Sequence, residues 1–332
     1  MKLATLKNGT RDGQLVVVSR NLEMAVEVAH IAATLQQAIE NWSAVEPRLQ
    51  AVSQALNSGT AEGAFAFDPA QAAAPLPRAY QWLDGSAFKS HGQLMDKAFN
   101  MEPNPDTDKI PLMYQGAGDD FIGPMDDVIL PSEEDGIDFE GEFAVLLDEV
   151  PMSCKAEDAE QHIKLILQLN DVSLRAHGPR EMRSGFGFLH AKPSSAFAPV
   201  AVTPDELGAG WNQGRVCLPL EVRWNDEIFG RPHGSEMHFN FPELIAHAAR
   251  TRKLGAGTVL GSGTVSNADA SVVGSACIAE RRALEIIDSG TAKTPFMTFG
   301  DRVRMEVRGE DNASVFGVID QRIVRSADGV SE

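Results

Sequence analysis

The first 76 residues combine one short apolar run with a longer helical pattern. Residues 15–18 are continuously apolar and follow the turn dipeptide Asp12-Gly13, so this run predicts a strand. From residue 24 to residue 56, apolar positions recur at the spacing of one helix face, which predicts mostly helix. Proline removes a helical hydrogen bond and clashes with the preceding turn, so we expect Pro47 to break or kink this helix.

A change in composition and hydrophobic pattern predicts a domain boundary near residue 76. Asn57-Ser58-Gly59-Thr60 is a loop signal, and residues 69–77 are rich in alanine and proline. Beyond them, short apolar runs alternate with glycine, aspartate and proline, at residues 143–147, 216–224, 258–260, 302–307 and 315–323. Two helices are expected between these runs, at 155–164 and 241–252. The pattern predicts a β-rich α+β fold, with a mixed-to-antiparallel β sandwich or roll over residues 77–332 and a small N-terminal α/β subdomain over residues 1–76.

Charge and composition narrow the class of protein. The 332 residues carry 29 basic and 47 acidic side chains, a formal net charge of −18, which disfavours binding to nucleic acid. The sequence has no run of about 18 apolar residues that would span a membrane, and its first residues lack a signal-peptide core. Cys154, Cys217 and Cys277 form no disulfide framework or metal-binding pair and are expected to serve ordinary packing. We therefore expect a cytoplasmic protein that binds neither nucleic acid nor membrane.

Glu140 and Glu142 give the sharpest chemical signal in the sequence. Because side chains alternate along a strand, the two glutamates face one side, and Phe139 and Phe143 face the other. Two neighbouring carboxylates repel each other and need a cation or a proton between them. Oxygen ligands suit Mg²⁺ or Ca²⁺, so this pair predicts a metal site. The alternative is a solvated edge strand with an acidic face.

Further candidate side chains lie on either side of this pair. Asp171 ends the apolar run at 165–169, where an unpaired carboxylate is costly, although it also fits the end of a strand or helix. Asp84 alone reads as a turn residue, and His91 stands out only because it follows Asp84 by seven residues. Arg175 follows Asp171 by four residues and could pair with a carboxylate.

Two glycine-rich stretches could bring the backbone close to a ligand. Residues 185–191 lead to Lys192, and residues 261–267 contain Thr264 just after a predicted strand. Neither has the residue order of a phosphate-binding P-loop, and both also fit ordinary turns.

Taken in order, these segments resemble the fumarylacetoacetate hydrolase family over roughly residues 77–325, and its shorter bacterial members in particular. The resemblance rests on Asp84 with His91, Tyr114-Gln115-Gly116, Asp138-Phe139-Glu140-Gly141-Glu142, residues 170–175, Lys192-Pro193, Gly263-Thr264-Val265-Ser266 and Glu280. Each motif is modest, but their joint order and spacing is specific. The resemblance implies a mixed β-sandwich roll behind a smaller N-terminal domain, and a homodimer.

The resemblance also implies a role for each candidate residue. One divalent cation, Mg²⁺ or Ca²⁺ with Mn²⁺ as an alternative, would bind to four acids: Asp84, Glu140, Glu142 and Asp171. His91 would be the general base that activates water, oriented by Glu280. The substrate oxygens, or the charge that develops on them, would be held by Arg175, Lys192 and Thr264, while Tyr114 would line the pocket.

The implied chemistry is hydrolysis of a carbon–carbon bond in a small dicarboxylate substrate, a β-diketone acid. Fumarylacetoacetate would give fumarate and acetoacetate, the last step of tyrosine degradation. The same scaffold hosts fumarylpyruvate and acylpyruvate hydrolases and 2-keto-acid hydratases, decarboxylases and isomerases, and a relative without activity is a further alternative. Gly178 stands where eukaryotic members have a glutamine and Ser86 where they have a tyrosine, so substrate recognition is the part that the resemblance leaves open.

Overall fold

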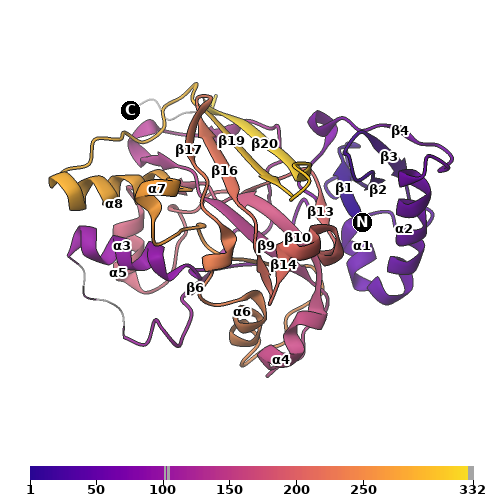
Figure 1. The fold of residues 1–332 in the computed structure, drawn as a ribbon, viewed down its shortest axis with the longest axis horizontal. Helices are drawn as coiled ribbons and strands as arrows, with labels where there is room; N and C mark the ends of the chain where they lie inside the picture. Colours follow the sequence, from indigo (N-terminus) through magenta and orange to yellow (C-terminus); the bar gives the residue numbers. More distant parts are fainter. Residues whose placement is uncertain (101, 103–104, 328–332) are drawn as a thin grey trace.

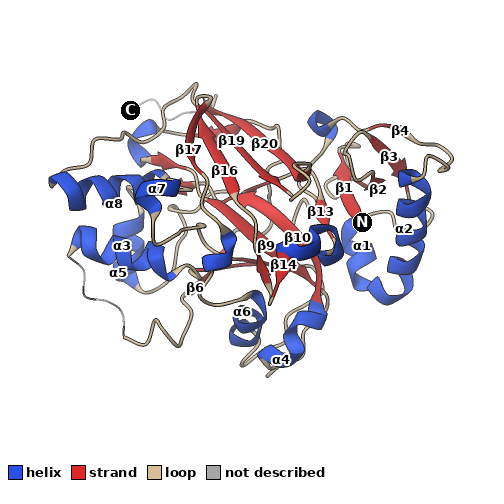
Figure 2. Cartoon of the chain, in the orientation of Figure 1, coloured by secondary structure: helices blue, strands red, loops and turns tan. Residues whose placement is uncertain are grey.

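The structure is a computed structural model that describes residues 1–100, 102 and 105–327. The last residues of the β sandwich or roll predicted over 77–332, residues 328–332, lie outside this description. Strands fill the middle of the molecule and most helices lie at its periphery (Figure 2). In the part of the chain that the structure describes, no helix is long and apolar enough to cross a membrane.

The larger of two main sheets has eleven strands and runs through both halves of the sequence. Its order is β4 (Phe65–Ala66), β3 (Met24–Glu27), β2 (Gln14–Val18), β1 (Lys2–Leu6), β13 (Ala201–Val202), β10 (Ile163–Asn170), β9 (Gly141–Leu147), β18 (Thr258–Gly261), β5 (Gln81–Gly85) and β6 (Met113–Gly116), with β12 (Ala196–Phe197) also paired to β10. Most neighbours are antiparallel, whereas β18 and β5 are parallel. The N-terminal strands join the rest of the sheet where Lys2 pairs with Val202.

The second main sheet packs against one face of the first. Its order is β17 (Glu227–Gly230), β16 (Leu220–Trp224), β19 (Arg302–Arg308), β20 (Ser314–Arg325) and β7 (Val128–Leu130). Two small pairs are β8 (Ile137–Asp138) with β11 (Ser173–Leu174), and β14 (Trp211–Asn212) with β15 (Arg215–Val216). Alternation along β9 divides the core: Phe143 and Val145 pack in the cluster that also holds Leu220 of β16, while Ala144 belongs to a second cluster on the opposite face. The prediction of a β-rich α+β fold is confirmed.

The helices lie around the sheets, and two groups of them lie at opposite ends of the molecule (Figure 1). The α-helices are α1 (Leu35–Glu40), α2 (Trp42–Asn57), α3 (Lys89–Phe99), α4 (Ala156–Ala159), α5 (Gly178–Ser184), α6 (Phe241–Ala248), α7 (Ala270–Val273) and α8 (Ile278–Ser289). Short 3₁₀ segments span Pro69–Gln71, Glu133–Asp135, Glu160–His162, Pro204–Gly210 and Gly234–Glu236. Helices α1 and α2 lie with the N-terminal strands at the right of the view, whereas α3, α5 and α8 lie at the left (Figure 1). Helices α3 and α8 pack against each other.

Several sequence predictions of individual elements are wrong. The start of the predicted helix at 24–56 is strand β3, because Ala25 and Val26 are buried within the sheet. Helix α2 continues through Pro47, which lies early in the helix and removes only one hydrogen bond there. The predicted helix at 155–164 contains one helical turn and a 3₁₀ segment, and strand β10 begins at Ile163. The predicted strand at 216–224 is divided between β15 and β16, and the helix predicted at 241–252 ends at Ala248.

Candidate active site

Three buried carboxylates meet at one edge of the larger sheet. Asp84 lies near the end of β5, Glu142 near the start of β9, and Asp171 directly after β10. Because β9 runs antiparallel to both β10 and β18, and β18 runs parallel to β5, these positions fall at the same edge. One oxygen of each carboxylate lies within 4.8 Å of the others, and all three side chains are buried. This cluster is a candidate metal centre.

The three carboxylates differ in how the protein satisfies them. Asp171 accepts hydrogen bonds from Tyr114 Oη at 2.7 Å, Lys192 Nζ at 2.6 Å and Ser195 Oγ at 2.7 Å. Asp84 accepts one from the backbone N–H of Gly263 at 3.0 Å. Both carboxylate oxygens of Glu142 are buried and have no hydrogen-bond partner among the residues that the structure describes.

Glu140 lies beside this cluster and is held by two cations. Its Oε2 accepts a hydrogen bond from Lys192 Nζ at 2.8 Å, and its Oε1 lies 2.6 Å from Arg175 Nη2 as an ion pair that lacks aligned hydrogen-bond geometry. Arg175 Nε donates to Asp138 at 2.8 Å. Asp138 also accepts the backbone N–H groups of Ile278 and Ala279, at 2.7 and 2.9 Å. Glu140 is therefore tied through Arg175 and Asp138 to the first turn of α8.

The buried carboxylates differ in whether their surroundings raise or lower their pKa. Burial, followed by repulsion from Asp171, raises the pKa of Asp84 well above its usual range, and burial with repulsion from Asp84 does the same to the pKa of Glu142. Burial also disfavours the ionised form of Glu140, but Lys192 and Arg175 overcome it and hold the pKa of Glu140 below its usual range. Burial and mutual repulsion therefore favour the protonated forms of Asp84 and Glu142, and a divalent cation bound between them would compete with those protons.

His91 and Glu280 face each other across the contact between two helices. His91 lies in the first turn of α3 and Glu280 in the first turn of α8, with Nδ1 3.9 Å from Oε2. Glu280 is 1% exposed, and its Oε1 accepts a hydrogen bond from Ser266 Oγ at 2.6 Å. His91 Nδ1 and Glu280 Oε2 are both buried without a hydrogen-bond partner among the described residues. The separation leaves room for a small adjustment or one bridging water.

Two family models match the chain. Residues 1–78 match the model described as fumarylacetoacetase N-terminal domain 2, and residues 81–324 match the fumarylacetoacetate hydrolase C-terminal model. The chain belongs to the fumarylacetoacetate hydrolase family. The resemblance deduced from the sequence motifs is therefore confirmed.

Members similar to this chain carry out several reactions. The mitochondrial oxaloacetate tautomerase Fahd2a of Rattus norvegicus is 30% identical over 166 residues, which is 49% of this chain and 50% of that protein. The chain thus spans about half the length of the curated relatives it matches. Two solved structures match 98% of this chain and all of theirs. They are a putative HpcE protein from Mycobacterium smegmatis (19% identity, TM-score 0.69) and maleylpyruvate hydrolase from Sphingobium sp. SYK-6 with manganese(II) and pyruvate (17%, 0.66).

Two of the predicted substrate-binding residues of this family member, Tyr114 and Thr264, lie at or next to groups that hydrogen-bond to the acid cluster. Tyr114 comes from β6; its ring packs edge-on against Phe188 with centroids 5.2 Å apart, and lies 5.6 Å from Lys192 Nζ. Thr264 is buried directly after Gly263, whose backbone holds Asp84. Gly263 has a φ of +74°, and a Cβ there would lie 2.3 Å from the carbonyl oxygen of Gly85, so this turn requires glycine.

Four residues near the site were not assigned roles from the sequence. They are Asp138, Ser195, Ser266 and Cys277. Asp138 and Ser266 lie inside motifs that carry the family resemblance, and Ser195 follows Lys192-Pro193, but nothing in the residue pattern distinguished them. Cys277 lies immediately before α8, which the apolar pattern did not predict.

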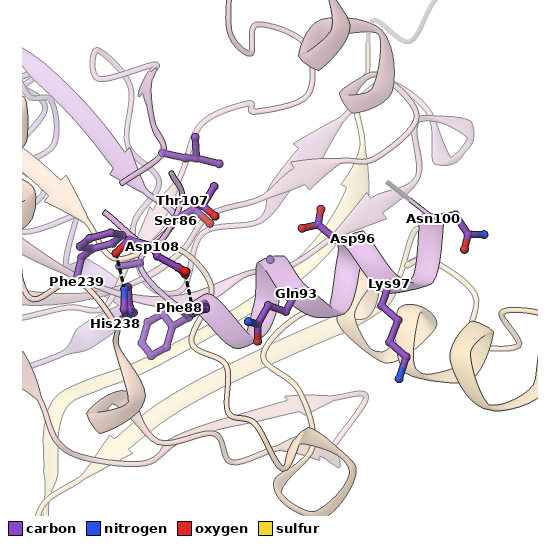
Figure 3. Close-up of a pocket in the computed structure, with 14 residues that line it drawn as sticks. Ser86, Phe88, Gln93, Asp96, Lys97, Asn100, Thr107, Asp108, His238 and Phe239 are labelled. Atoms are coloured by element: carbon purple, nitrogen blue, oxygen red, sulfur yellow. Dashed lines mark hydrogen bonds and ion pairs between the residues drawn. The ribbon is translucent and has the colours of Figure 1, made fainter. Parts of the chain in front are cut away.

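A separate pocket lies on the other side of α3. It has a volume of about 700 Å³, and His91 and the three clustered carboxylates do not line it. Lys89, Gln93, Asp96 and Asn100 line it from α3 and its C-cap, and His238 lies near the start of α3, with its Nε2 3.2 Å from the carbonyl oxygen of Asp108 (Figure 3). These α3 positions lie about half a turn away from His91. Helix α3 therefore separates this pocket from the pair formed by His91 and Glu280.

Proposed function

We propose that this protein is a divalent-cation-dependent hydrolase of a carbon–carbon bond in a small β-diketone acid, with fumarylacetoacetate as the leading substrate. The observation that carries the proposal is the buried cluster of Asp84, Glu142 and Asp171, in which both oxygens of Glu142 lack a protein partner. The proposal also uses the imidazole–carboxylate pair of His91 and Glu280, because His91 is close enough to Glu140, beside the cluster, to favour the ionised form of that carboxylate and lower its pKa.

The carboxylate cluster fits a hard divalent cation. All donor atoms are carboxylate oxygens, which suit Mg²⁺, Ca²⁺ or Mn²⁺, and unpartnered buried carboxylates are costly unless a cation compensates them. Asp84, Glu142 and Asp171 would hold the cation, while the fourth predicted ligand, Glu140, lies alongside and here binds Lys192 and Arg175. When bound, the cation supplies Lewis-acid stabilisation of negative charge on the substrate oxygens.

In this proposal, His91 and Glu280 activate water. With His91 Nδ1 facing Glu280, Nε2 is the atom that takes a proton from water. Glu280 stabilises the imidazolium that forms, because an adjacent carboxylate favours the charged ring. Ser266 fixes Glu280 through Oε1 and leaves Oε2 directed toward His91.

Lys192, Arg175, Thr264 and Tyr114 would bind the substrate. Carboxylates outnumber the two cationic side chains in this site, so a dianionic substrate needs the added positive charge of the metal to enter. Lys192 and Arg175 then hold the oxygens on which negative charge develops. The Tyr114 hydroxyl, now bonded to Asp171, fixes one wall of the site.

A second candidate function is tautomerisation or decarboxylation of a short 2-oxo diacid. The similarity to an oxaloacetate tautomerase supports this alternative. The His91–Glu280 pair favours hydrolysis, because hydrolysis requires an activated water and tautomerisation does not. A relative without activity would be expected to lose a metal-binding acid or the base, and all five side chains are present.

A turnover panel tests these alternatives. The purified chain is assayed with fumarylacetoacetate, fumarylpyruvate, acylpyruvates and oxaloacetate in the presence of Mg²⁺ or Mn²⁺, with Glu142→Gln as the matched inactive control. We expect metal-dependent release of fumarate and acetoacetate from fumarylacetoacetate. Turnover of oxaloacetate without cleavage of any diketone acid would replace the proposal by the tautomerase alternative.

A further inference from the structure

We propose that His91, Cys277 and Glu280 form a second metal site, selective for a thiophilic divalent cation such as Zn²⁺ or Cd²⁺, at which binding blocks the general base. One donor atom of each residue, an imidazole nitrogen, a thiol sulfur and a carboxylate oxygen, lies within 4.8 Å of the other two. This cluster is distinct from the Asp84, Glu142 and Asp171 cluster and shares no residue with it.

Two of these donor atoms, one on His91 and one on Glu280, are buried without a hydrogen-bond partner in the part of the chain that the structure describes. Glu280 is 1% exposed, yet its Oε2 has no hydrogen-bond partner among the described residues, and the same is true of His91 Nδ1. Buried polar atoms are normally paired, and each unpaired one indicates strain, unseen water or a bound ion. Here the two unpaired atoms face each other at 3.9 Å, and the Cys277 thiol lies beside them.

The start of helix α8 holds the thiol and the carboxylate together. Cys277 is the residue that caps α8, and its sulfur accepts the backbone N–H of Glu280 at 3.4 Å. Residues at this spacing around a helix start face each other, as in the capping arrangement of serine and glutamate. Ser266 occupies the other oxygen of Glu280, so only Oε2 is available for a ligand. The guanidinium of Arg175, which also lies near the thiol, is neutralised by Asp138 and Glu140.

Ligand chemistry separates the two clusters. Zn²⁺ is bound in proteins by cysteine, histidine and carboxylate side chains, commonly three of them with a water at the fourth position. Mg²⁺, Ca²⁺ and Mn²⁺ prefer oxygen ligands, namely carboxylates, carbonyl groups and water. The thiol, imidazole and carboxylate set therefore selects the softer cation, and the all-carboxylate set selects the harder one.

Occupancy of this site has a direct chemical consequence. When the cation binds, the Cys277 thiol releases its proton to solvent and forms a metal–sulfur bond; the single ring proton of His91 moves to Nε2 through solvent, so that Nδ1 and Oε2 each donate a lone pair. No oxidation or reduction occurs. An imidazole that binds a cation through Nδ1 carries its proton on Nε2 and has no lone pair left there to accept a proton from water, and Glu280 can no longer stabilise an imidazolium. This inhibitory effect rests on the proposed function, but the binding itself does not.

A spectroscopic titration tests the binding. The full chain is first saturated with Mg²⁺ and then titrated with Co²⁺ or Cd²⁺, while thiolate-to-metal charge-transfer absorption is recorded. We expect the band to saturate at one cation per chain, to disappear in Cys277→Ser and to persist in the matched controls Cys154→Ser and Cys217→Ser. A missing band, or one that survives in Cys277→Ser, would overturn the proposal. If Cys277→Ser fails to fold, His91→Ala serves instead, with at least tenfold weaker binding expected and unchanged binding overturning the site.

An inhibition assay tests the consequence. With Mg²⁺ in excess, Zn²⁺ should inhibit turnover. The Zn²⁺ concentration that halves the zinc-free activity of Cys277→Ser should be at least tenfold higher than the concentration that halves the activity of the parent protein. Cys217→Ser should match the parent protein. Equal inhibition of Cys277→Ser and parent would overturn the inhibitory role. If no diketone acid is turned over, the proposed function fails, while the absorption titration still decides whether the site exists.

Discussion

Asp138 receives the Nε–H of Arg175 at 2.8 Å while both of its carboxylate oxygens cap the first turn of helix α8. The side chain is fully enclosed, and the positive end of the helix adds to the attraction for its negative charge. Through this one carboxylate, the arginine that holds Glu140 and the helix that carries Glu280 are fixed relative to each other. In the proposed mechanism, this carboxylate links an arginine that binds the substrate to the helix whose glutamate assists the activation of water.

Asp138→Asn should weaken catalysis through position rather than through direct chemistry. The amide has one acceptor oxygen where the carboxylate has two, so Arg175 or one of the N–H groups loses its partner. We expect the free energy of unfolding to fall by about 1–3 kcal/mol and metal affinity or kcat/KM to fall about 10–100-fold. Urea titration, metal titration and steady-state kinetics measure these effects. Asp135→Asn, which instead releases His177, is the control, and equal losses in both variants would contradict the positioning role.

Glu142→Ala should abolish turnover and weaken metal binding without unfolding the protein. Removing this carboxylate relieves the repulsion within the buried cluster, and the core is large enough to fold without the metal. Thermal unfolding in excess chelator should therefore occur at or above the temperature of the parent protein. Full activity of the parent after confirmed metal removal would refute the metal requirement.

His91→Ala should lower kcat by about 10²–10⁴-fold, the usual contribution of a positioned acid–base group. Substrate binding should change little, because Arg175, Lys192 and the metal still hold the oxygens. Steady-state kinetics on the true substrate separate kcat from KM. His30→Ala, at an exposed N-terminal position, controls for loss of a histidine. A kcat equal to that of the parent would eliminate His91 as the base.

The acid cluster could be anticipated from the sequence, because strand alternation indicated the glutamate pair and the order of the family motifs indicated the two aspartates. Glu140 and Glu142 were expected on one side of a strand with Phe139 and Phe143 on the other, and both phenylalanines pack in the same core cluster. The distinct surroundings of the two glutamates could not be anticipated. They depend on Lys192 and Arg175, which reach Glu140 from segments 35 or more residues away and leave Glu142 unpaired.

The helices that carry His91 and Glu280 were not predicted from the sequence, for a physical reason. In α3 the apolar residues are confined to the second half, at positions 94, 95, 98 and 99, and this stretch is too short to mark a helix by its pattern. Helix α8 begins with buried Ile278, Ala279 and Glu280, and a buried glutamate does not register as part of an apolar face. The His91–Glu280 relationship was therefore available only from the family motif, not from periodicity.

The homodimer implied by the family resemblance stays a prediction. Light scattering of the purified chain at micromolar concentration should give twice the mass of 35.8 kDa. A monomer at that concentration would contradict it. A dilution series separates a weak dimer from a monomer, because only the former changes mass with concentration.

The last prediction concerns a buried lysine far from the catalytic site. Lys2 is 3% exposed, and its Nζ donates hydrogen bonds to the carbonyl oxygens of Ser314 at 2.9 Å and Val315 at 2.7 Å. Burial lowers the pKa of Lys2 from 10.5 to about 8. Between these two values the unfolded chain binds more protons than the folded chain, so stability rises as the pH increases.

The cost of burying the charged lysine is fully present below pH 8 and is relieved as the pH rises toward 10.5. The full effect is roughly 3 kcal/mol, since one unit of pKa corresponds to about 1.4 kcal/mol. Lys2→Met removes this titration. The unfolding free energy of the parent protein should therefore rise relative to that of Lys2→Met between pH 7 and pH 10. Urea titrations across that range measure it, with Lys7→Met, at an exposed ion pair with Asp126, as the control. A Lys2→Met difference that stays constant with pH would show that the lysine is buried without a shift in its protonation.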